Sequence, residues 1–252
     1  MRVGAVSYLN TKPLIYRFSD FAPDAELVLD VPSRLADRLR AGELDVALIP
    51  SVEALRVPKY KIVSNACIAC RGPVLSVKLL SRVPIARIQT LALDQSSRTS
   101  VTLLRILLGE RLGIKPHLSP LAIGDVQWES NIETDAVLVI GDRAIHASQL
   151  VYSDQWDLGQ EWWQWTGLPF VFAMWMARPD VETHSVDKAL RKSRDAGVAG
   201  LDAIAESAAQ EVGLDAATCL SYLRDNLHFS LGTAEQQGLL RFHHYAVRFG
   251  FV

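Results

Sequence analysis

The feature that most constrains the fold is an alternation of short apolar runs and helical patterns in the first fifty residues. Arg2–Val6, Glu26–Val31 and Asp45–Ile49 have the character of buried strands. Between the second and third runs, Pro32 opens a helical pattern that Gly42 ends. A series of strands and helices with short connections predicts a parallel sheet with right-handed crossovers, and therefore an α/β fold.

A second strand–helix pair carries a distinctive polar segment. Leu91–Asp94 reads as the end of a buried strand, and a helical pattern runs from Val101 to a stop at Gly113. Ser96–Ser100 lies between them, and no acidic residue follows in the first turn. Because a helix N-terminus exposes unpaired N–H groups and is positive, this segment predicts a site for a carboxylate or phosphate. An ordinary serine cap is an equally good interpretation.

The composition is that of an ordinary globular protein. Its 252 residues suffice for one large α/β domain or two small lobes, with 49% apolar residues and a formal net charge of −2. That charge gives no drive toward nucleic acid or an anionic membrane. No run approaches the roughly 18 apolar residues that span a bilayer. The stretch Met1–Ser7 turns polar too early for a secretory signal, so we expect a cytoplasmic protein with neither nucleic-acid nor membrane partners.

No cofactor or metal motif is recognisable. Cys67 and Cys70 have CxxC spacing, but Arg71-Gly72-Pro73 follows them instead of a helix, and there is no second pair. The six histidines are scattered, and neither a glycine-rich phosphate loop nor a nucleophile elbow occurs. We therefore expect a small-molecule site without cofactor or metal.

Several polar residues follow predicted strands. Ser7–Asn10 follows the first strand, Ser51 follows the third, and Ser76 is the one hydroxyl in the apolar run Val74–Leu80. In open α/β sheets, ligands bind beyond the carboxyl ends of the strands. The alternative for the first segment is a capped turn with Pro13 in the first turn of a helix.

Asp142 follows another predicted central strand, Asp135–Ile140. An acid at this edge of the sheet is a candidate general base. Asp142 is also well placed to cap a helix over Arg143–Leu150, and N-cap preferences favour that interpretation.

Two segments are suited to crossing between lobes, namely Val83–Thr90 and the apolar run Phe170–Met176. The residues after the second crossing follow helical patterns almost to the end of the chain, and we expect these helices to cover the first lobe.

Seven motifs spread from end to end of the chain resemble the chorismate dehydratases of the futalosine route to menaquinone. They are Ser7-Tyr-Leu-Asn-Thr-Lys-Pro-Leu14, Asp45-Val-Ala-Leu-Ile-Pro-Ser51, Arg71-Gly-Pro73 with Ser76-Val77, Ser97-Arg-Thr-Ser100, Ile140-Gly-Asp142, Trp165-Thr-Gly-Leu-Pro-Phe170 and Tyr222-Leu-Arg-Asp-Asn-Leu-His-Phe229. The sister family, dihydroxynaphthoate synthase, carries His-Glu-Gly where this chain has Ile140-Gly141-Asp142. Lacking that histidine, the chain resembles the dehydratases.

The resemblance implies a type II periplasmic-binding-protein-like fold. Each lobe would be a mostly parallel sheet flanked by helices, with the C-terminal helices packed on lobe one. Residues 1–90 and 176–252 would form the first lobe and residues 91–175 the second, with the ligand cleft between them.

The resemblance also implies a reaction and a set of site residues. Chorismate, a dicarboxylate, would lose water without a cofactor to give 3-[(1-carboxyvinyl)oxy]benzoate. Asn10 would be catalytic, either by hydrogen-bonding the C4 hydroxyl or by positioning the reacting edge of the substrate. One substrate carboxylate would lie on Ser97, Arg98, Thr99 and Ser100 at the helix N-terminus, and the rest of the pocket would be formed by Ser7, Tyr8, Ser51, Ser76, Gly141 and Asp142. The base would be either Asp142 or the substrate's own enolpyruvyl carboxylate.

Two alternatives stay open beside this one. A binding protein or sensor of the same fold would hold a small acid unchanged, and a related dehydratase would act on another cyclohexadienyl acid. Transport proteins of this fold need a signal peptide or lipid anchor, and from the N-terminal sequence we expect neither.

Overall fold

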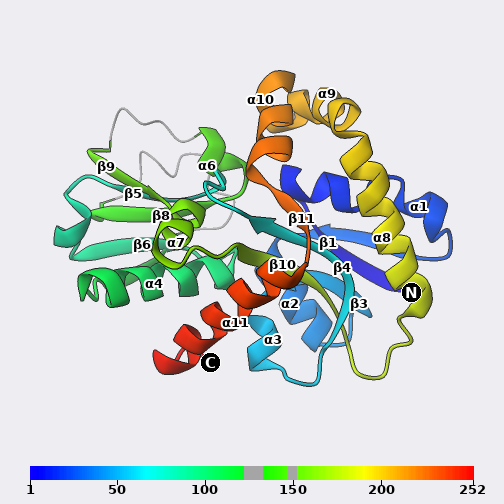
Figure 1. Cartoon of the computed structure of the whole chain (residues 1–252), viewed down its shortest axis with the longest axis horizontal. Helices are drawn as coiled ribbons and strands as arrows, with labels where there is room; N and C mark the ends of the chain where they lie inside the picture. Colours follow the sequence, from blue (N-terminus) through cyan, green and yellow to red (C-terminus); the bar gives the residue numbers. More distant parts are fainter. Residues whose placement is uncertain (122–132, 147–151) are drawn as a thin grey trace.

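The computed structural model describes residues 1–121, 133–146 and 152–252, which form two β-sheets with helices packed around them (Figure 1). The chain therefore has the two-lobe α/β architecture expected from the sequence. Within the described residues, no helix combines the length and apolar character needed to cross a membrane.

The first sheet has six strands in the order β11-β4-β10-β3-β1-β2. The bounds are β1 Arg2–Val6, β2 Glu26–Asp30, β3 Val46–Pro50, β4 Lys61–Cys70, β10 Phe170–Ala177 and β11 His228–Ser230. β1 pairs in parallel with β2 and β3, as the strand–helix alternation predicts. The pairings of β10 with β3 and β4, and of β4 with β11, are antiparallel.

The second sheet has five strands in the order β7-β6-β8-β5-β9. The bounds are β5 Val77–Ser81, β6 Thr90–Asp94, β7 His117–Leu121, β8 Ala136–Ile140 and β9 Asp154–Asp157. β6 is parallel to β7 and β8, whereas β5 is antiparallel to β8 and β9. Among the described strands, β1 to β4 share one direction in the first sheet and β6 to β9 share one direction in the second, as expected for mostly parallel sheets. The reversed strands are β10, β11 and β5.

The sheets also place the lobe crossings differently from the expected boundaries. β5 belongs to the second sheet, so the chain leaves the first lobe after β4 and not near residue 90. It returns before β10, which lies in the first sheet, and not near residue 176. By sheet membership, lobe I holds the strands before Cys70 and from Phe170 onward, and lobe II holds those from Val77 to Asp157.

Helices surround the two lobes. Those with the first sheet are η1 Leu9–Leu14, α1 Phe18–Phe21, α2 Pro32–Arg40, α3 Glu53–Arg56, α8 His184–Ala199, α9 Leu201–Val212, α10 Ala216–Ser221 and η3 Tyr222–Asn226. Those with the second are η2 Ile85–Arg87, α4 Arg98–Leu112, α6 Asp142–His146 and α7 Leu158–Thr166. The last helix, α11 Thr233–Arg248, runs below both lobes in Figure 1. Arg248 on α11 pairs with Glu110 on α4 at 2.9 Å, so this C-terminal helix also contacts lobe II.

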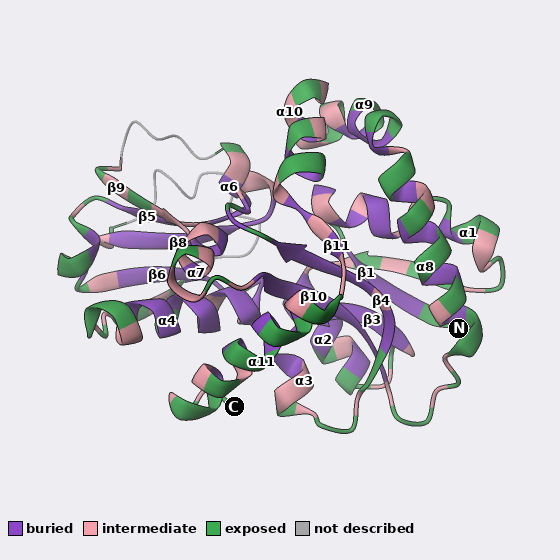
Figure 2. Ribbon diagram, viewed as in Figure 1, coloured by how far each residue is buried: buried purple, intermediate pink, exposed green. Residues whose placement is uncertain are grey.

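The core is continuous through both lobes (Figure 2). Every residue of β3, β8 and β10 is buried, which explains why these strands read as unbroken apolar runs. Burial of this kind stabilises each sheet by roughly 25 cal/mol per Å² of apolar surface removed from water. The two packed sheets therefore fix the positions of the loops that lie between the lobes.

Candidate active site

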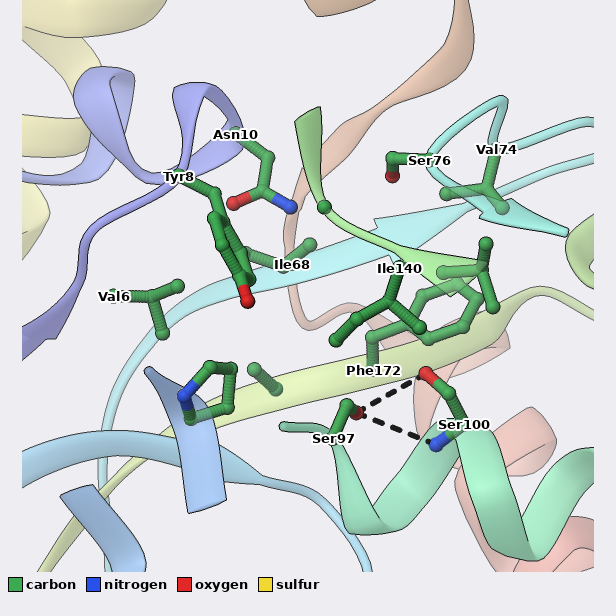
Figure 3. Close-up of a pocket in the computed structure, with 14 residues that line it drawn as sticks. Val6, Tyr8, Asn10, Ile68, Val74, Ser76, Ser97, Ser100, Ile140 and Phe172 are labelled. Atoms are coloured by element: carbon green, nitrogen blue, oxygen red, sulfur yellow. Dashed lines mark hydrogen bonds between the residues drawn. The ribbon is translucent and has the colours of Figure 1, made fainter. Parts of the chain in front are cut away.

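A cavity lies between the lobes, and the described residues around it are mostly apolar or uncharged polar. Its lining encloses about 440 Å³ of space free of protein atoms, open solvent at its mouth included. The lining comes from the ends of β1 and β8, the N-termini of α2 and α4, the β4–β5 connection and β10 (Figure 3). The lining residues are Val6, Tyr8, Asn10, Pro32, Ile68, Val74, Ser76, Val77, Ser97, Ser100, Ile140, Gly141, Phe172 and Ala173.

The N-terminus of α4 forms one side of this cavity. Ser97 is the N-cap, and its Oγ accepts hydrogen bonds from the Ser100 N–H at 3.4 Å and the Ser100 hydroxyl at 3.1 Å. The serine-cap interpretation is therefore confirmed. Both serines also face the cavity, and the first turn holds no acid that would neutralise its positive end. The hydroxyl proton of Ser97 stays available for a ligand, because Ser97 acts only as an acceptor in these two bonds.

Arg98 was expected in the site, but it does not line the cavity. Its guanidinium pairs with Asp37 at 2.7 Å and Glu53 at 3.3 Å, two acids of lobe I. The reason is electrostatic: Glu53 is only 1% exposed, and a buried carboxylate needs cations around it.

Thr99 and Ser51 likewise face each other away from the cavity. Thr99 Oγ1 accepts the Val52 N–H at 3.1 Å, and Ser51 Oγ donates to the Val171 carbonyl at 2.7 Å. Together with Arg98 they form a joint between the lobes.

Asn10 and Tyr8 enter the cavity from the opposite side, at the start of η1 (Figure 3). Asn10 Oδ1 accepts the Thr11 hydroxyl at 3.2 Å. The Tyr8 hydroxyl donates to Ser96 Oγ at 3.2 Å, and burial raises the pKa of Tyr8 to about 12. Tyr8 is therefore a neutral hydrogen-bonding group. Ser7 is exposed and does not line the cavity.

Gly141 lies against Tyr8. Its φ of +74° belongs to the left-handed region, and a Cβ there would approach the Tyr8 ring to 2.9 Å. Only glycine lets the end of β8 and the Tyr8 ring come this close.

Asp142 does not take the helix-capping role that N-cap preferences favoured. Its carboxylate accepts the backbone N–H of Leu9, with N–O distances of 3.1 and 3.2 Å, instead of capping its own helix. Burial raises the pKa of Asp142 to about 6. The expected helix begins here as α6, and residues 147–150 of it lie outside the described residues.

Sequence reasoning missed the role of Asp94 at the end of β6. This buried carboxylate accepts the Arg143 guanidinium, the Ser96 N–H at 3.0 Å and the Ile140 N–H at 3.3 Å. Tyr8, bonded to Ser96, joins the same network across the lobes. The sequence does show an acid at the end of a strand, next to a serine-containing segment. Its arginine partner, Arg143, lies 49 residues away, so no local pattern indicates the ion pair.

Sequence reasoning also missed the role of Tyr222, whose hydroxyl donates a hydrogen bond to Ser76 Oγ at 2.8 Å. The only signal was that Tyr222 begins one of the recognisable motifs.

The arrangement can bind a small molecule rich in oxygen acceptors. The described lining contributes hydroxyls, one amide and a helix N-terminus, and none of its side chains is ionised. In the described ranges, no three histidine, cysteine or acidic side chains gather as metal ligands would.

Two lobes around a ligand cavity define a periplasmic-binding-protein-like fold. Structural comparison agrees: a crystal structure of an Archaeoglobus fulgidus protein superposes with a TM-score of 0.79 at 16% identity, covering 100% of this chain and 98% of that one. The periplasmic aliphatic sulphonate binding protein SsuA of Escherichia coli gives 0.59 at 15% identity, with 98% and 87% covered.

Sequence comparison is more specific. Residues 1–248 match the family described as menaquinone biosynthesis, and the chain belongs to this family. A chorismate dehydratase of Thermus thermophilus is 29% identical, over 95% of this chain and 93% of that protein. A chorismate dehydratase of Campylobacter jejuni is 27% identical, over 96% of both chains.

Proposed function

We propose that this protein is a chorismate dehydratase, which eliminates water from chorismate to give 3-[(1-carboxyvinyl)oxy]benzoate. The observation that carries the proposal is the match to two chorismate dehydratases over nearly their whole length. The uncharged cavity between the lobes, lined by apolar side chains with a few hydroxyls and one amide, suits the reaction. We also propose that the step belongs to the futalosine route, as the resemblance of the motifs implies, and that it takes place in the cytoplasm.

The reaction balances without a redox partner. The C3–H bond breaks, C3 and C4 become doubly bonded, and the C4 hydroxyl leaves with a proton as water. The ring becomes aromatic, which supplies the driving force. Negative charge spreads toward the ring carboxylate as the C3 proton departs.

In this proposal the two sides of the cavity bind different parts of the substrate. Ser97, Ser100 and the positive end of α4 hold the ring carboxylate and stabilise the charge that develops on it. Asn10, on the opposite side, hydrogen-bonds the C4 hydroxyl. Tyr8, Ser76 and Gly141 complete the pocket.

The base in this proposal is the enolpyruvyl carboxylate of the substrate itself. Among the described side chains that line the cavity, none is a carboxylate or imidazole. Asp142 is nearby, but both of its oxygens are engaged by the Leu9 N–H. A base carried by the substrate is held next to the C3 proton by the same contacts that bind it.

The test is to mix the purified protein with chorismate, without added metal or nucleotide, and follow the diene absorbance and product mass. Loss of one water with a new aromatic product supports the proposal. Chorismate that stays intact while it raises the Tm contradicts it and indicates a binding protein of the same fold.

A further inference from the structure

Ser76 is presented to the cavity by a strained turn. Leu75, the residue before it, has a φ of +59°, one of three positive values at non-glycine residues in the described part of the chain. The Ser76 N–H bonds the Val74 carbonyl at 2.7 Å, two residues back, which makes a γ-turn. Such strain persists only where neighbouring contacts hold it, and it clusters at functional sites.

Asp157 holds the backbone of this turn. Its carboxylate accepts the Val74 N–H at 2.9 and 3.0 Å and the Leu75 N–H at 2.7 Å. It also caps α7 through the Gln160 N–H at 3.0 Å. One half-buried carboxylate therefore joins the turn to the N-terminus of a helix of lobe II.

Tyr222 holds the same turn from lobe I. Its side chain is 1% exposed, and its hydroxyl donates to Ser76 Oγ at 2.8 Å. Tyr222 begins η3, a π-helical turn, and such turns occur frequently at functional sites. At the other end of η3, Asn226 donates to the Pro73 carbonyl at 3.0 Å. The connection between β4 and β5 is thus bound on both sides.

This bonding pattern decides what Ser76 can offer a ligand. Because Ser76 Oγ already accepts the Tyr222 proton, its own hydroxyl proton is directed elsewhere, and Ser76 lines the cavity. One buried phenol therefore orients a polar group on the cavity wall.

We propose that Tyr222 and Asp157 are positioning residues that lock Ser76 as a hydrogen-bond donor to a carboxylate or hydroxyl oxygen of the substrate. Tyr222 sets the orientation of the hydroxyl, and Asp157 holds the turn that carries it. The proposal relies on the proposed function only for the identity of the substrate.

A double-mutant cycle tests whether Tyr222 acts through Ser76. Tyr222→Phe, Ser76→Ala and the double variant are compared with wild type in kcat/KM for chorismate. Tyr222→Phe should lower kcat/KM roughly tenfold alone and less than about twofold when Ser76 is already alanine. Equal losses in both backgrounds would overturn the proposal. Tyr245→Phe, whose ring packs on Trp162 and Trp165 outside the cavity, is the matched control and should match wild type.

Asp157→Asn provides a second variant that does not depend on the folding of Tyr222→Phe. Asparagine keeps one oxygen for the helix cap and loses the second acceptor for the turn. In the same cycle its effect on kcat/KM should also vanish when Ser76 is alanine, and additive losses would contradict the role of Asp157.

Amide hydrogen exchange separates this proposal from the proposed function, because it requires no turnover. In the ligand-free protein, exchange at Leu75 and Ser76 should quicken at least roughly tenfold in Asp157→Asn and Tyr222→Phe. Unchanged exchange would overturn the positioning role even if chorismate is converted. Faster exchange in the two variants, together with a wild-type protein that does not convert chorismate, would support positioning and remove only the substrate assignment.

Discussion

The carboxylate of Asp142 in lobe II accepts the backbone N–H of Leu9 in lobe I, at 3.1 and 3.2 Å, immediately before Asn10. This bond joins the lobes at the cavity wall. The Tyr8 hydroxyl makes a second contact across the same boundary, to Ser96. The position of Asn10 is therefore tied to how lobe II sits against lobe I.

Asp142 should make stability depend on pH. Burial raises its pKa from the usual 3.8 to about 6, so the folded protein binds its proton more tightly than the unfolded chain does. The stabilisation is present in full below about pH 4 and is lost as the pH rises through about 6. Relative to Asp142→Asn, wild type should lose on the order of 1–3 kcal/mol over this range, seen as diverging Tm values. Asp24→Asn, an exposed control, should follow wild type, and parallel profiles for Asp142→Asn would refute the effect.

Asn10→Ala should abolish turnover while the fold stays intact. Removal of one oriented hydrogen-bond donor from an active site typically lowers kcat about 100- to 1000-fold, and we expect a loss of this size when the Asn10 amide is removed. Single-turnover kinetics with chorismate and a thermal melt measure the two quantities separately. Lys12→Ala, on the same η1 turn but paired with Glu211 outside the cavity, should keep near-normal kcat. Near-normal kinetics for Asn10→Ala would remove Asn10 from the mechanism.

Gly141→Ala should distort the site through Tyr8. The new Cβ would lie 2.9 Å from the Tyr8 ring. The ring would have to shift to relieve this clash, and a shift would disturb the hydrogen bond from the Tyr8 hydroxyl to Ser96. We expect kcat/KM to fall at least roughly tenfold. Gly113→Ala is the matched control: its φ of +68° carries a similar backbone cost of about 1–2 kcal/mol, but no atom lies within 4 Å of the new Cβ. Equal kinetic losses in the two variants would show that backbone strain alone is responsible.

Substitution of Arg98 tests whether its side chain contacts the ligand or only residues of the other lobe. Because its guanidinium pairs with Asp37 and Glu53, Arg98→Ala and Asp37→Ala should change KM for chorismate similarly, each within roughly threefold. The two KM values, measured side by side, check this. A rise of tenfold or more in Arg98→Ala alone would instead support the carboxylate contact expected from the sequence.

Local sequence patterns predicted the buried elements well. The helix expected from Val101 to the stop at Gly113 is α4, and the apolar runs at Val46–Pro50 and Ala136–Ile140 are central strands. These succeed because burial on both faces demands apolar side chains throughout. The strands β7, β9 and β11 were not predicted. Each pairs with a single neighbour at a sheet edge, and partial exposure removes the apolar periodicity that would identify it.

Only some of the residues in the motifs near the cavity line it. Of the eleven residues expected in the site, six line the cavity: Tyr8, Asn10, Ser76, Ser97, Ser100 and Gly141. Five do not: Ser7, Ser51, Arg98, Thr99 and Asp142. Neighbours in a motif differ because successive residues at a helix N-terminus point about 100° apart, so Ser97 and Ser100 share a face that Arg98 and Thr99 leave.

The sequence by itself determined that this is an α/β chain with a serine-rich helix N-terminus that no acid neutralises, because strand and helix periodicities and cap chemistry are local properties. Only the tertiary structure decided which side chains meet. The partners Leu9 and Asp142, Ser76 and Tyr222, and Arg98 and Asp37 lie between 61 and 146 residues apart in the chain. Their pairing depends on how the two sheets pack against each other, and no local sequence pattern encodes the relative distance or orientation of the sheets.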